Sequence, residues 1–305
     1  MKILVATEKP FSAAAVASIR EVVESAGLEL VTLEKYTERA ELLAAVAEAE
    51  GLIVRSDIVD AEVLAAAPQL KIVVRAGAGY DNIDLAAATA RGVVVMNTPG
   101  QNANAVAELA LGMLIYVVRE GFSGRTGTEL MGKTLGLHAF GAVARNVARV
   151  AQGLGMDVDA YDPFLTAEQI AAAGVKPVAT AEELYSTCQY VSLHIPATKE
   201  TVGSIGYGLL STMPRGAALI NTARKEVVDE AGLERLMDER PDFRYVADVK
   251  PAAAERFAEK YGSRVFFTPK KSGAQTAEAN SNAGIAAARQ SVGYLKEGID
   301  RFRVN

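Results

Sequence analysis

The chain has 305 residues, of which 50% are hydrophobic and 23% are charged, and its formal net charge is −5. This length suits two domains of about 100 to 200 residues each, and a chain this apolar with so small a net charge is not disordered. The negative net charge argues against a nucleic-acid partner, which would require a basic face, but local arginines could still bind a small anion such as a phosphate.

The first predicted element is a strand at residues 2–6. Its apolar run is far short of the roughly 20 residues of a membrane-spanning helix and lacks the longer apolar core of a signal peptide. The single cysteine, Cys188, excludes an internal disulfide and is typical of a reducing compartment. We therefore expect a cytoplasmic protein with no membrane partner.

Short β-branched runs alternate with alanine-rich helical segments, such as 12–26 and 60–67, along the whole chain. A first series of predicted strands lies at residues 2–6, 28–33, 51–56, 71–75 and 93–97. A second series lies at residues 134–139, 158–161, 190–193, 217–221, 245–249 and 265–268. Such alternation is typical of parallel strands that helices bury on both faces. The sequence therefore predicts an α/β fold with two doubly wound parallel sheets.

Two longer helical patterns fall outside both series, and each predicts a buried apolar stripe. The stripe of the first helix, which follows Asn102, consists of Val106, Leu109, Met113 and Val117. The stripe of the second consists of Ile285, Ala288, Val292, Leu295 and Ile299. Either both helices connect the domains, with the last one returning the chain to the N-terminal domain, or each covers its own sheet.

The segment from Thr134 to Ala148 reads as a strand, a tight turn and the start of a helix. The usual dinucleotide fingerprint is Gly-x-Gly-x-x-Gly/Ala, and here it reads Ala139-Phe-Gly-Ala-Val-Ala144. The central Gly141, which lets the backbone approach a pyrophosphate, is present. Alanine at the third position is an accepted variant, whereas alanine at the first is a departure. A generic strand-turn-helix remains the alternative interpretation of this segment.

The acidic residue that follows such a turn by about 20 residues supports the dinucleotide interpretation. Asp162 comes directly after the predicted strand at 158–161. A carboxylate there accepts hydrogen bonds from both ribose hydroxyls and repels a 2′-phosphate, so we expect NAD rather than NADP. We expect His138, just before the turn, to be a packing residue.

Several further segments, taken together, resemble the D-2-hydroxyacid dehydrogenase family. They are Arg75-Ala-Gly-Ala-Gly-Tyr-Asp-Asn-Ile-Asp84, Asn97-Thr-Pro-Gly-Gln-Asn102 with Ala105-Val-Ala-Glu108, Ser192-Leu-His-Ile-Pro196, and Ile220-Asn-Thr-Ala-Arg224 with Val228-Asp-Glu230. The match runs in order from about Lys2 to the C-terminus. Within the family, the chain most resembles a short form that acts on a phosphorylated hydroxy acid and lacks a following regulatory domain.

The resemblance implies NAD-dependent oxidation of D-3-phosphoglycerate to 3-phosphohydroxypyruvate, the first step of phosphorylated serine biosynthesis. It also implies a flavodoxin-like substrate domain at residues 1–98 plus 279–305, and a Rossmann NAD-binding domain at residues 99–278. The active site would lie between them, and a homodimer would form through the NAD-binding domain. The alternatives are a dehydrogenase of another D-2-hydroxy acid, such as glycerate or lactate, and a catalytically silent NAD-sensing protein.

The resemblance assigns the substrate to two groups of residues. Arg224 would bind the carboxylate and carbonyl oxygen through its planar guanidinium, helped by the backbone amides of Gly77, Ala78 and Gly79. The phosphate would be bound by residues at the ends of the predicted strands, namely Arg55, Ser56 and Arg75. Asn102 and Asn104 are further candidate substrate contacts, although Asn102 could instead be a helix N-cap.

The proton-transfer group departs from the family pattern. Most relatives have Thr-Pro-His before a Gly-Gly or Gly-Ala pair, whereas this chain reads Thr268-Pro-Lys-Lys-Ser-Gly-Ala274. Counting back from the Gly-Ala pair places Lys271 at the histidine position, with Lys270 as the alternative. The glutamate that orients the histidine is also missing from its usual spacing. A lysine is protonated without a carboxylate partner, so we predict that Lys271 exchanges the hydroxyl proton.

The remaining candidate residues are on the cofactor side. The resemblance and the fingerprint together assign NAD to Phe140, Gly141, Ala142, Val143, Asp162, His194, Pro196, Thr222, Ala223 and Asp248. We expect no catalytic role for His194. No cluster of side chains in the sequence suggests a metal site.

Overall fold

The computed structural model describes all 305 residues, which form two compact units. Unit 1 consists of Met1–Asn102 and Gln275–Asn305, and unit 2 consists of Ala103–Ala274. The sequence predicted the two breaks at 98/99 and 278/279. In the structure the first break falls at the start of helix α5 (Ala103–Val118), and the second falls shortly before helix α12 (Ala277–Glu297).

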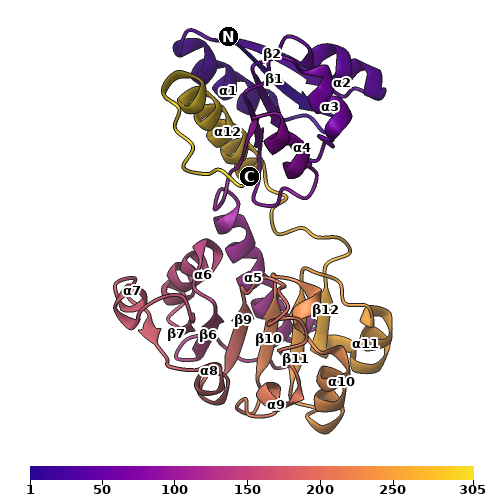
Figure 1. The fold of residues 1–305 in the computed structure, drawn as a ribbon. Helices are drawn as coiled ribbons and strands as arrows, with labels where there is room; N and C mark the ends of the chain where they lie inside the picture. The colour runs from indigo at the N-terminus through magenta and orange to yellow at the C-terminus, as the bar shows by residue number, and fades with distance from the viewer. The chain divides into compact units, whose positions relative to one another are not determined.

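Unit 1 is built on a parallel sheet of five strands in the order β2-β1-β3-β4-β5 (Figure 1). The strands are β1 (Lys2–Thr7), β2 (Glu29–Glu34), β3 (Gly51–Val54), β4 (Ile72–Arg75) and β5 (Val94–Asn97). This is the strand order of flavodoxin-like folds, in which ligands bind at the carboxyl ends of the strands where the order reverses. In unit 1 the strand order reverses between β1 and β3. The residues that follow Val54, the last residue of β3, therefore lie where such folds bind their ligands.

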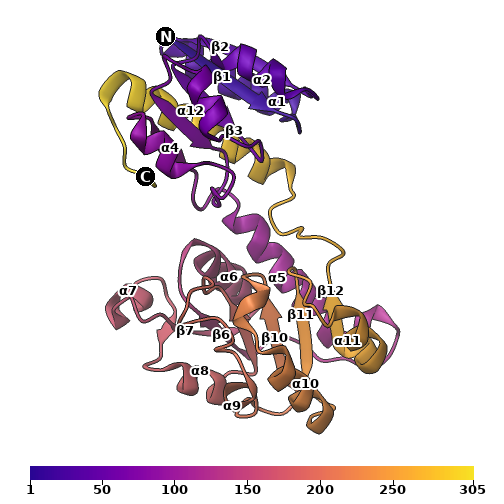
Figure 2. The same ribbon diagram turned by 45° about the vertical axis from the view of Figure 1, so that its right-hand side comes forward.

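Alternate residues of each strand in unit 1 face opposite sides of the sheet, and both sides are covered by helices. Helices α1 (Ala13–Ser25) and α12 bury one face, as Figure 2 shows, with Ile3, Val5 and Ile19 in that layer. The other face carries α2 (Arg39–Val46), α3 (Ala61–Ala66) and α4 (Leu85–Ala90). The C-terminal helix therefore returns the chain to the N-terminal unit, as predicted.

Unit 2 is built on a parallel sheet of seven strands in the order β12-β11-β10-β9-β6-β7-β8. The strands are β6 (Thr134–His138), β7 (Asp157–Tyr161), β8 (Lys176–Pro177), β9 (Tyr190–Leu193), β10 (Ala218–Asn221), β11 (Arg244–Ala247) and β12 (Val265–Phe267). The first six strands along the chain follow the doubly wound dinucleotide-binding order, and its reversal lies between β6 and β9. The prediction of two doubly wound parallel sheets is confirmed.

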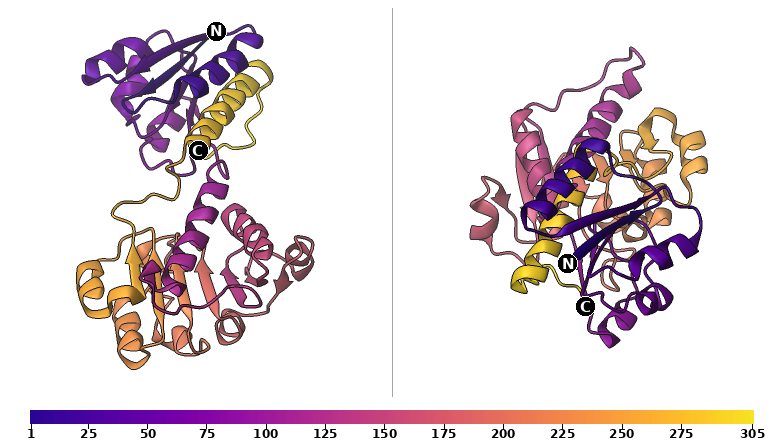
Figure 3. Two further views of the ribbon diagram at one scale, coloured as in Figure 1. Left: turned by 180° about the vertical axis from the view of Figure 1, so that it is seen from behind. Right: turned by 90° about the horizontal axis from the view of Figure 1, so that it is seen from above.

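Helices cover both faces of the sheet in unit 2 as well, as the left view of Figure 3 shows. One layer contains α5, α6 (Ala142–Gly153) and α7 (Ala167–Ala171). The other contains α8 (Ala181–Thr187), α9 (Tyr207–Leu210), α10 (Glu230–Glu239) and α11 (Ala254–Tyr261). None of the chain's helices combines the length and the apolar character that crossing a bilayer would require.

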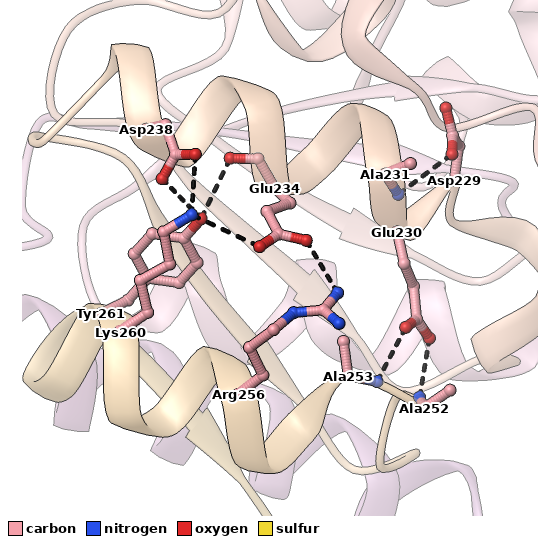
Figure 4. Close-up of polar contacts among 10 residues, drawn as sticks. All are labelled: Asp229, Glu230, Ala231, Glu234, Asp238, Ala252, Ala253, Arg256, Lys260 and Tyr261. Atoms are coloured by element: carbon pink, nitrogen blue, oxygen red, sulfur yellow. Dashed lines mark hydrogen bonds and ion pairs between the residues drawn. The ribbon is translucent and has the colours of Figure 1, made fainter.

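Polar contacts fix α11 to α10 at the end of the sheet (Figure 4). The carboxylate of Glu230 accepts hydrogen bonds from the amides of Ala252 and Ala253, at 2.8 and 2.9 Å. Lys260 donates to Asp238 at 2.8 Å. These contacts hold the segment between β11 and β12 in place, and the loop that carries the two candidate lysines follows β12.

Three predictions from the pattern were wrong in detail. Strand β8 has two residues, which is too short for a run of β-branched residues to reveal it. In α5 the predicted Met113 and Val117 are buried, but Val106 and Leu109 are only half-buried, and alanine and leucine residues form much of the buried face in their place. The predicted stripe of the last helix also fails at Ile299, which lies beyond the end of α12 and is 52% exposed.

Candidate functional site

The turn after β6 carries the dinucleotide fingerprint. Ala139 adopts a φ of +72°, a left-handed backbone conformation that favours glycine. Gly141 is the N-cap of α6, and a Cβ added to it would meet no atom within 4 Å. A ligand can therefore approach the backbone at the amino end of α6, where helix N–H groups attract anions. Ala144 is fully buried and lets α6 pack closely on the sheet.

Asp162 follows β7 and contacts the fingerprint turn directly. Its Oδ2 accepts a hydrogen bond from the amide of Phe140 at 2.8 Å, and its Oδ1 accepts one from the amide of Phe164 at 2.9 Å. Each carboxylate oxygen has a second lone pair for a ribose hydroxyl. Asp162 thus fixes the turn and presents a negative charge beside it.

The carboxyl ends of β9 and β10 meet the start of α6 in one hollow of about 270 Å³. It is lined by Val143, His194, Ile195, Pro196, Thr222, Ala223 and Arg224. Six of these seven residues were predicted site residues, and they come from three separate segments of the sequence. The hollow lies beside the reversal of strand order between β6 and β9, where a doubly wound sheet binds its ligand.

Two polar atoms of the hollow are buried without a hydrogen-bond partner, namely Nε2 of His194 and Oγ1 of Thr222. Buried polar atoms are normally satisfied, so the hollow is suited to a polar ligand. Burial, together with the nearby His138, lowers the pKa of His194 to about 3, and the imidazole is therefore neutral at physiological pH. The fingerprint turn, Asp162 and these unsatisfied atoms fit a dinucleotide.

His138 has the packing role that the sequence indicated. It is buried, its Nδ1 lies 3.2 Å from the hydroxyl of Tyr185, and burial lowers its pKa to about 4. Its carbonyl accepts the amide of His194 at 3.0 Å. Cys188 is also buried, and burial raises the pKa of its thiol to about 12, so it is unreactive.

Arg224 lies at the mouth of the hollow, on the exposed side. Asn221, at the end of β10, fixes the backbone around it. Its Nδ2 donates to the carbonyl of Arg224, and its Oδ1 accepts the amide of Ala223, both at 2.9 Å. The guanidinium itself contacts only the carbonyl of Ala223 among hydrogen-bond acceptors, at 2.9 Å. It is therefore available to a carboxylate.

The loop that carries Lys270 and Lys271 is anchored by Asp248. This side chain is 1% exposed and accepts three hydrogen bonds, from Oγ1 of Thr268 at 2.8 Å and from the amides of Ser272 and Gly273 at 2.7 and 2.8 Å. The loop approaches so closely that a Cβ on Gly273 would lie 2.9 Å from the carboxylate. Asp248 therefore holds both ends of the exposed Lys270–Lys271 segment.

In unit 1, Arg55 directly follows β3, and Arg75 is the last residue of the neighbouring strand β4. The Nη1 of Arg55 donates to the carbonyls of Lys9 and Pro10, at 2.8 and 3.2 Å. The Nε of Arg75 donates to the carbonyl of Arg55 at 3.0 Å. Neither guanidinium forms a salt bridge, and burial lowers the pKa of both. Ser56 lies beside them and is exposed.

The glycine-rich turn after β4 is shaped by Arg75. Gly77 has a φ of +151°, and a Cβ there would overlap the Arg75 guanidinium at 1.4 Å. The amide of Gly77 donates to the carbonyl of Arg75 at 2.9 Å, so it is already occupied. Ala78 and Gly79 are exposed, and their role as amide donors to a carboxylate stays a prediction.

The two candidate asparagines fall in different units. Asn102 is the last residue of the first segment of unit 1 and is half-buried. Asn104 lies in α5 of unit 2, where its amide already bridges Glu108 and Arg149, each at 2.7 Å. Both polar atoms of the Asn104 side chain are therefore already engaged.

Sequence reasoning missed two residues that shape the site. Asn280, on α12, accepts a hydrogen bond from Nη2 of Arg55 at 2.7 Å. Asp57 is 4% exposed and accepts from the amide of Arg55 and from the Tyr36 hydroxyl, at 3.1 and 2.9 Å. The sequence contained a signal for Asp57, because it directly follows the predicted strand at 51–56, but it contained no local signal for Asn280.

Comparison with known proteins agrees with this geometry. The sequence profile of the D-isomer specific 2-hydroxyacid dehydrogenase catalytic domain matches residues 4–305. The D-3-phosphoglycerate dehydrogenase of Mycobacterium tuberculosis (strain H37Rv) is 38% identical over 273 residues, which cover 82% of this chain and 50% of the relative. That of Archaeoglobus fulgidus is 37% identical over 313 residues, covering 97% of this chain and 58% of the relative. The chain thus spans about half the length of the curated relatives it matches.

Among solved structures, an NAD⁺-bound 3-phosphoglycerate dehydrogenase of Entamoeba histolytica is 48% identical, with a TM-score of 0.83, and the match covers 100% of this chain and 98% of that one. A D-isomer specific 2-hydroxyacid dehydrogenase of Lactobacillus delbrueckii has a TM-score of 0.85 at 20% identity, which shows the shared fold alone. Both units and both sheets fall within these matches. The chain belongs to the D-isomer specific 2-hydroxyacid dehydrogenase family.

Proposed function

We propose that this protein is an NAD-dependent dehydrogenase that oxidises D-3-phosphoglycerate to 3-phosphohydroxypyruvate. The observation that carries the proposal is the hollow of unit 2, where the start of α6 and the ends of β9 and β10 gather six predicted site residues. The similarity to the NAD⁺-bound 3-phosphoglycerate dehydrogenase of Entamoeba histolytica supports both the cofactor and the substrate.

The cofactor side is formed by unit 2, which we propose to be the NAD-binding domain. The pyrophosphate binds at Gly141 and the first amides of α6, from Ala142 onward, and Asp162 accepts the ribose hydroxyls. His194 and Thr222 offer their unsatisfied atoms to the remainder of the dinucleotide. When bound, NAD supplies the hydride acceptor for C2 of the substrate.

Arg224 binds the substrate carboxylate, because its planar guanidinium forms paired, directional bonds and stays charged. Lys271 exchanges the proton of the C2 hydroxyl. In the oxidative direction Nζ of Lys271 accepts that proton as hydride leaves C2, so the O–H and C–H bonds break and the ketone forms. Asp248 holds the loop of Lys271 on both sides, so the lysine does not depend on the glutamate that orients a histidine in most relatives.

The phosphate side is formed by unit 1, which we propose to be the substrate-binding domain. Arg55 and Arg75 are half-buried cations that form no salt bridge, although the carboxylates of Asp57 and Asp81 lie near them, and a dianionic phosphate can bind both. Glycerate and lactate offer no group for two cations, which favours the phosphorylated substrate over them. We further propose, from the family resemblance, a homodimer and a cytoplasmic location.

The decisive test is NADH formation from NAD and D-3-phosphoglycerate at alkaline pH, with the ketone product trapped by hydrazine. Reduction of 3-phosphohydroxypyruvate by NADH is measured in parallel. We expect turnover in both directions, and at least 100-fold lower kcat/KM for D-glycerate and D-lactate, because about 3 kcal/mol of charge-assisted hydrogen bonding is lost with the phosphate. Binding of NADH without turnover of any of the three acids would instead support an NAD-sensing protein.

A further inference from the structure

We propose that Asn280, on helix α12, is a positioning residue for substrate phosphate. Its neutral side-chain amide orients the Arg55 guanidinium without cancelling the positive charge. The inference rests on the proposed function, since it concerns specificity for a substrate with a dianionic phosphate, and it adds a residue from the far end of the sequence to that site.

Every acceptor around the Arg55 guanidinium is neutral. Nη2 donates to Oδ1 of Asn280 at 2.7 Å, and Nη1 donates to the carbonyls of Lys9 and Pro10. The guanidinium carbon also lies 5.2 Å from the centre of the Phe11 ring, within the range of a cation–π contact. These contacts fix the plane of the guanidinium on several sides. The nearby carboxylate of Asp57 offsets part of the positive charge, but it forms no salt bridge with the guanidinium.

The neighbouring Arg75 adds a second positive charge, which favours the binding of an anion. It lies close enough to Arg55 for the two positive charges to repel each other, and this repulsion adds to burial in lowering the pKa of Arg75. Two other half-buried arginines, Arg240 and Arg244, form salt bridges with Asp242 and Glu120, whereas Arg264 donates only to backbone carbonyls. Arg55 and Arg75 also form no salt bridge, and they differ from Arg264 in being two neighbouring cations whose mutual repulsion an anion would relieve.

The packing of α12 on α1 determines where Asn280 lies. Gly284 follows Asn280 by one helical turn on the same face. A Cβ on Gly284 would lie 2.8 Å from Ile19 and 2.9 Å from the Phe11 ring. Because glycine allows this close approach, α12 contacts both the aromatic ring under Arg55 and the guanidinium itself. The C-terminal helix thereby sets the orientation of a residue at the end of β3.

Two substitutions at position 280 distinguish the orientation of the Arg55 guanidinium from its positive charge. An alanine would remove the 2.7 Å hydrogen bond and leave the guanidinium freer to rotate. An aspartate has the same shape as asparagine, but it would form an ion pair with Arg55 and repel a phosphate. It would not harm the fold, because a negative charge near the amino end of a helix is favourable.

The test compares Asn280→Ala and Asn280→Asp with Asn282→Asp, a matched control in which the same charge is placed on an exposed position of α12. The steady-state KM for D-3-phosphoglycerate and kcat are measured for each. For Asn280→Ala we expect KM to rise about tenfold, the value of one hydrogen bond to a charged group, with kcat within twofold. For Asn280→Asp we expect a rise on the order of 100-fold, and for Asn282→Asp no change beyond twofold.

A second readout does not depend on turnover. Inorganic phosphate should raise the melting temperature of the wild type and of Asn282→Asp, and should have no effect on Asn280→Asp, whose melting temperature without phosphate should equal or exceed that of the wild type. A KM for Asn280→Asp within threefold of the wild type, with full stabilisation by phosphate, would overturn the inference. If the wild type turns over no phosphorylated acid, the proposed function fails, and the phosphate-dependent melting still decides whether Asn280 controls an anion site.

Discussion

Replacing Ala139 with glycine removes a methyl group from the turn between β6 and α6, and we expect this deletion to stabilise unit 2. The backbone of Ala139 has a φ of +72°, which costs a residue with a Cβ about 1–2 kcal/mol. Glycine avoids that cost. Two smaller effects oppose the gain: the unfolded chain becomes more flexible, which destabilises the folded state by about 0.4–1 kcal/mol, and the loss of a half-buried methyl group costs about 0.4 kcal/mol. The net expectation is a gain of about 0.5 kcal/mol.

The matched control is Ala144→Gly, the same chemical change five residues later. Ala144 is fully buried inside α6, so glycine there costs about 1 kcal/mol in helix propensity and about 0.8 kcal/mol in lost burial. The two deletions should therefore shift the free energy of unfolding in opposite directions, with a difference of about 2 kcal/mol. At about 2–4 °C per kcal/mol for a unit of this size, the two melting temperatures should differ by roughly 4–8 °C.

Differential scanning calorimetry of the NAD-free protein measures both shifts, and the transition that NADH moves upward identifies unit 2. The dissociation constant of NADH should change less than twofold in Ala139→Gly, because the same backbone conformation is present with and without ligand. If Ala139→Gly lowers the melting temperature as much as Ala144→Gly does, the argument from backbone strain is refuted.

Three further predictions concern the site and its pH dependence. Lys271→Ala should lower kcat by about 10²–10⁴-fold, the usual contribution of a proton-transfer group, and should leave the dissociation constant of NADH unchanged. Lys270→Ala is the matched control and should change kcat little. A larger loss of kcat in Lys270→Ala than in Lys271→Ala would assign the proton-transfer role to Lys270. Asp162→Asn should weaken NADH binding about tenfold and lower the preference for NADH over NADPH, measured by the fluorescence of the bound nucleotide; an unchanged preference would contradict the ribose role. Burial lowers the pKa of His138 to about 4 and that of His194 to about 3, whereas both histidines titrate near 6.5 in the unfolded chain. The free energy of unfolding should therefore be highest above pH 6.5 and should decrease as the pH falls. At pH 5 the loss should be about 2 kcal/mol per histidine. Urea unfolding at pH 8 and pH 5 measures this loss, and His138→Gln should reduce it by about half; a loss of the same size in the variant would contradict the assignment.

The alternation of strands and helices was readable from the sequence because each buried strand is a short run of β-branched residues, as in Ile72–Arg75. The fingerprint turn and Asp162 were readable because their contact joins neighbouring strands. The bond between Asn280 and Arg55 spans 225 residues and depends on how α12 packs, which no local pattern contains. The left-handed backbone at Ala139 was equally hidden, since alanine is not the residue that such a conformation favours.

Unit 1 is interrupted by the whole of unit 2, and this order matters when the chain is synthesised. As residues leave the ribosome, β1 to β5 emerge first, yet one face of their sheet is buried by Ala283, Ala287 and Ala288 of α12. Unit 2 is one contiguous segment, so it can fold before α12 has been synthesised and has buried that face of the unit 1 sheet. The hydrogen bond between Asn280 and Arg55 can therefore form only after the whole of unit 2 has been synthesised.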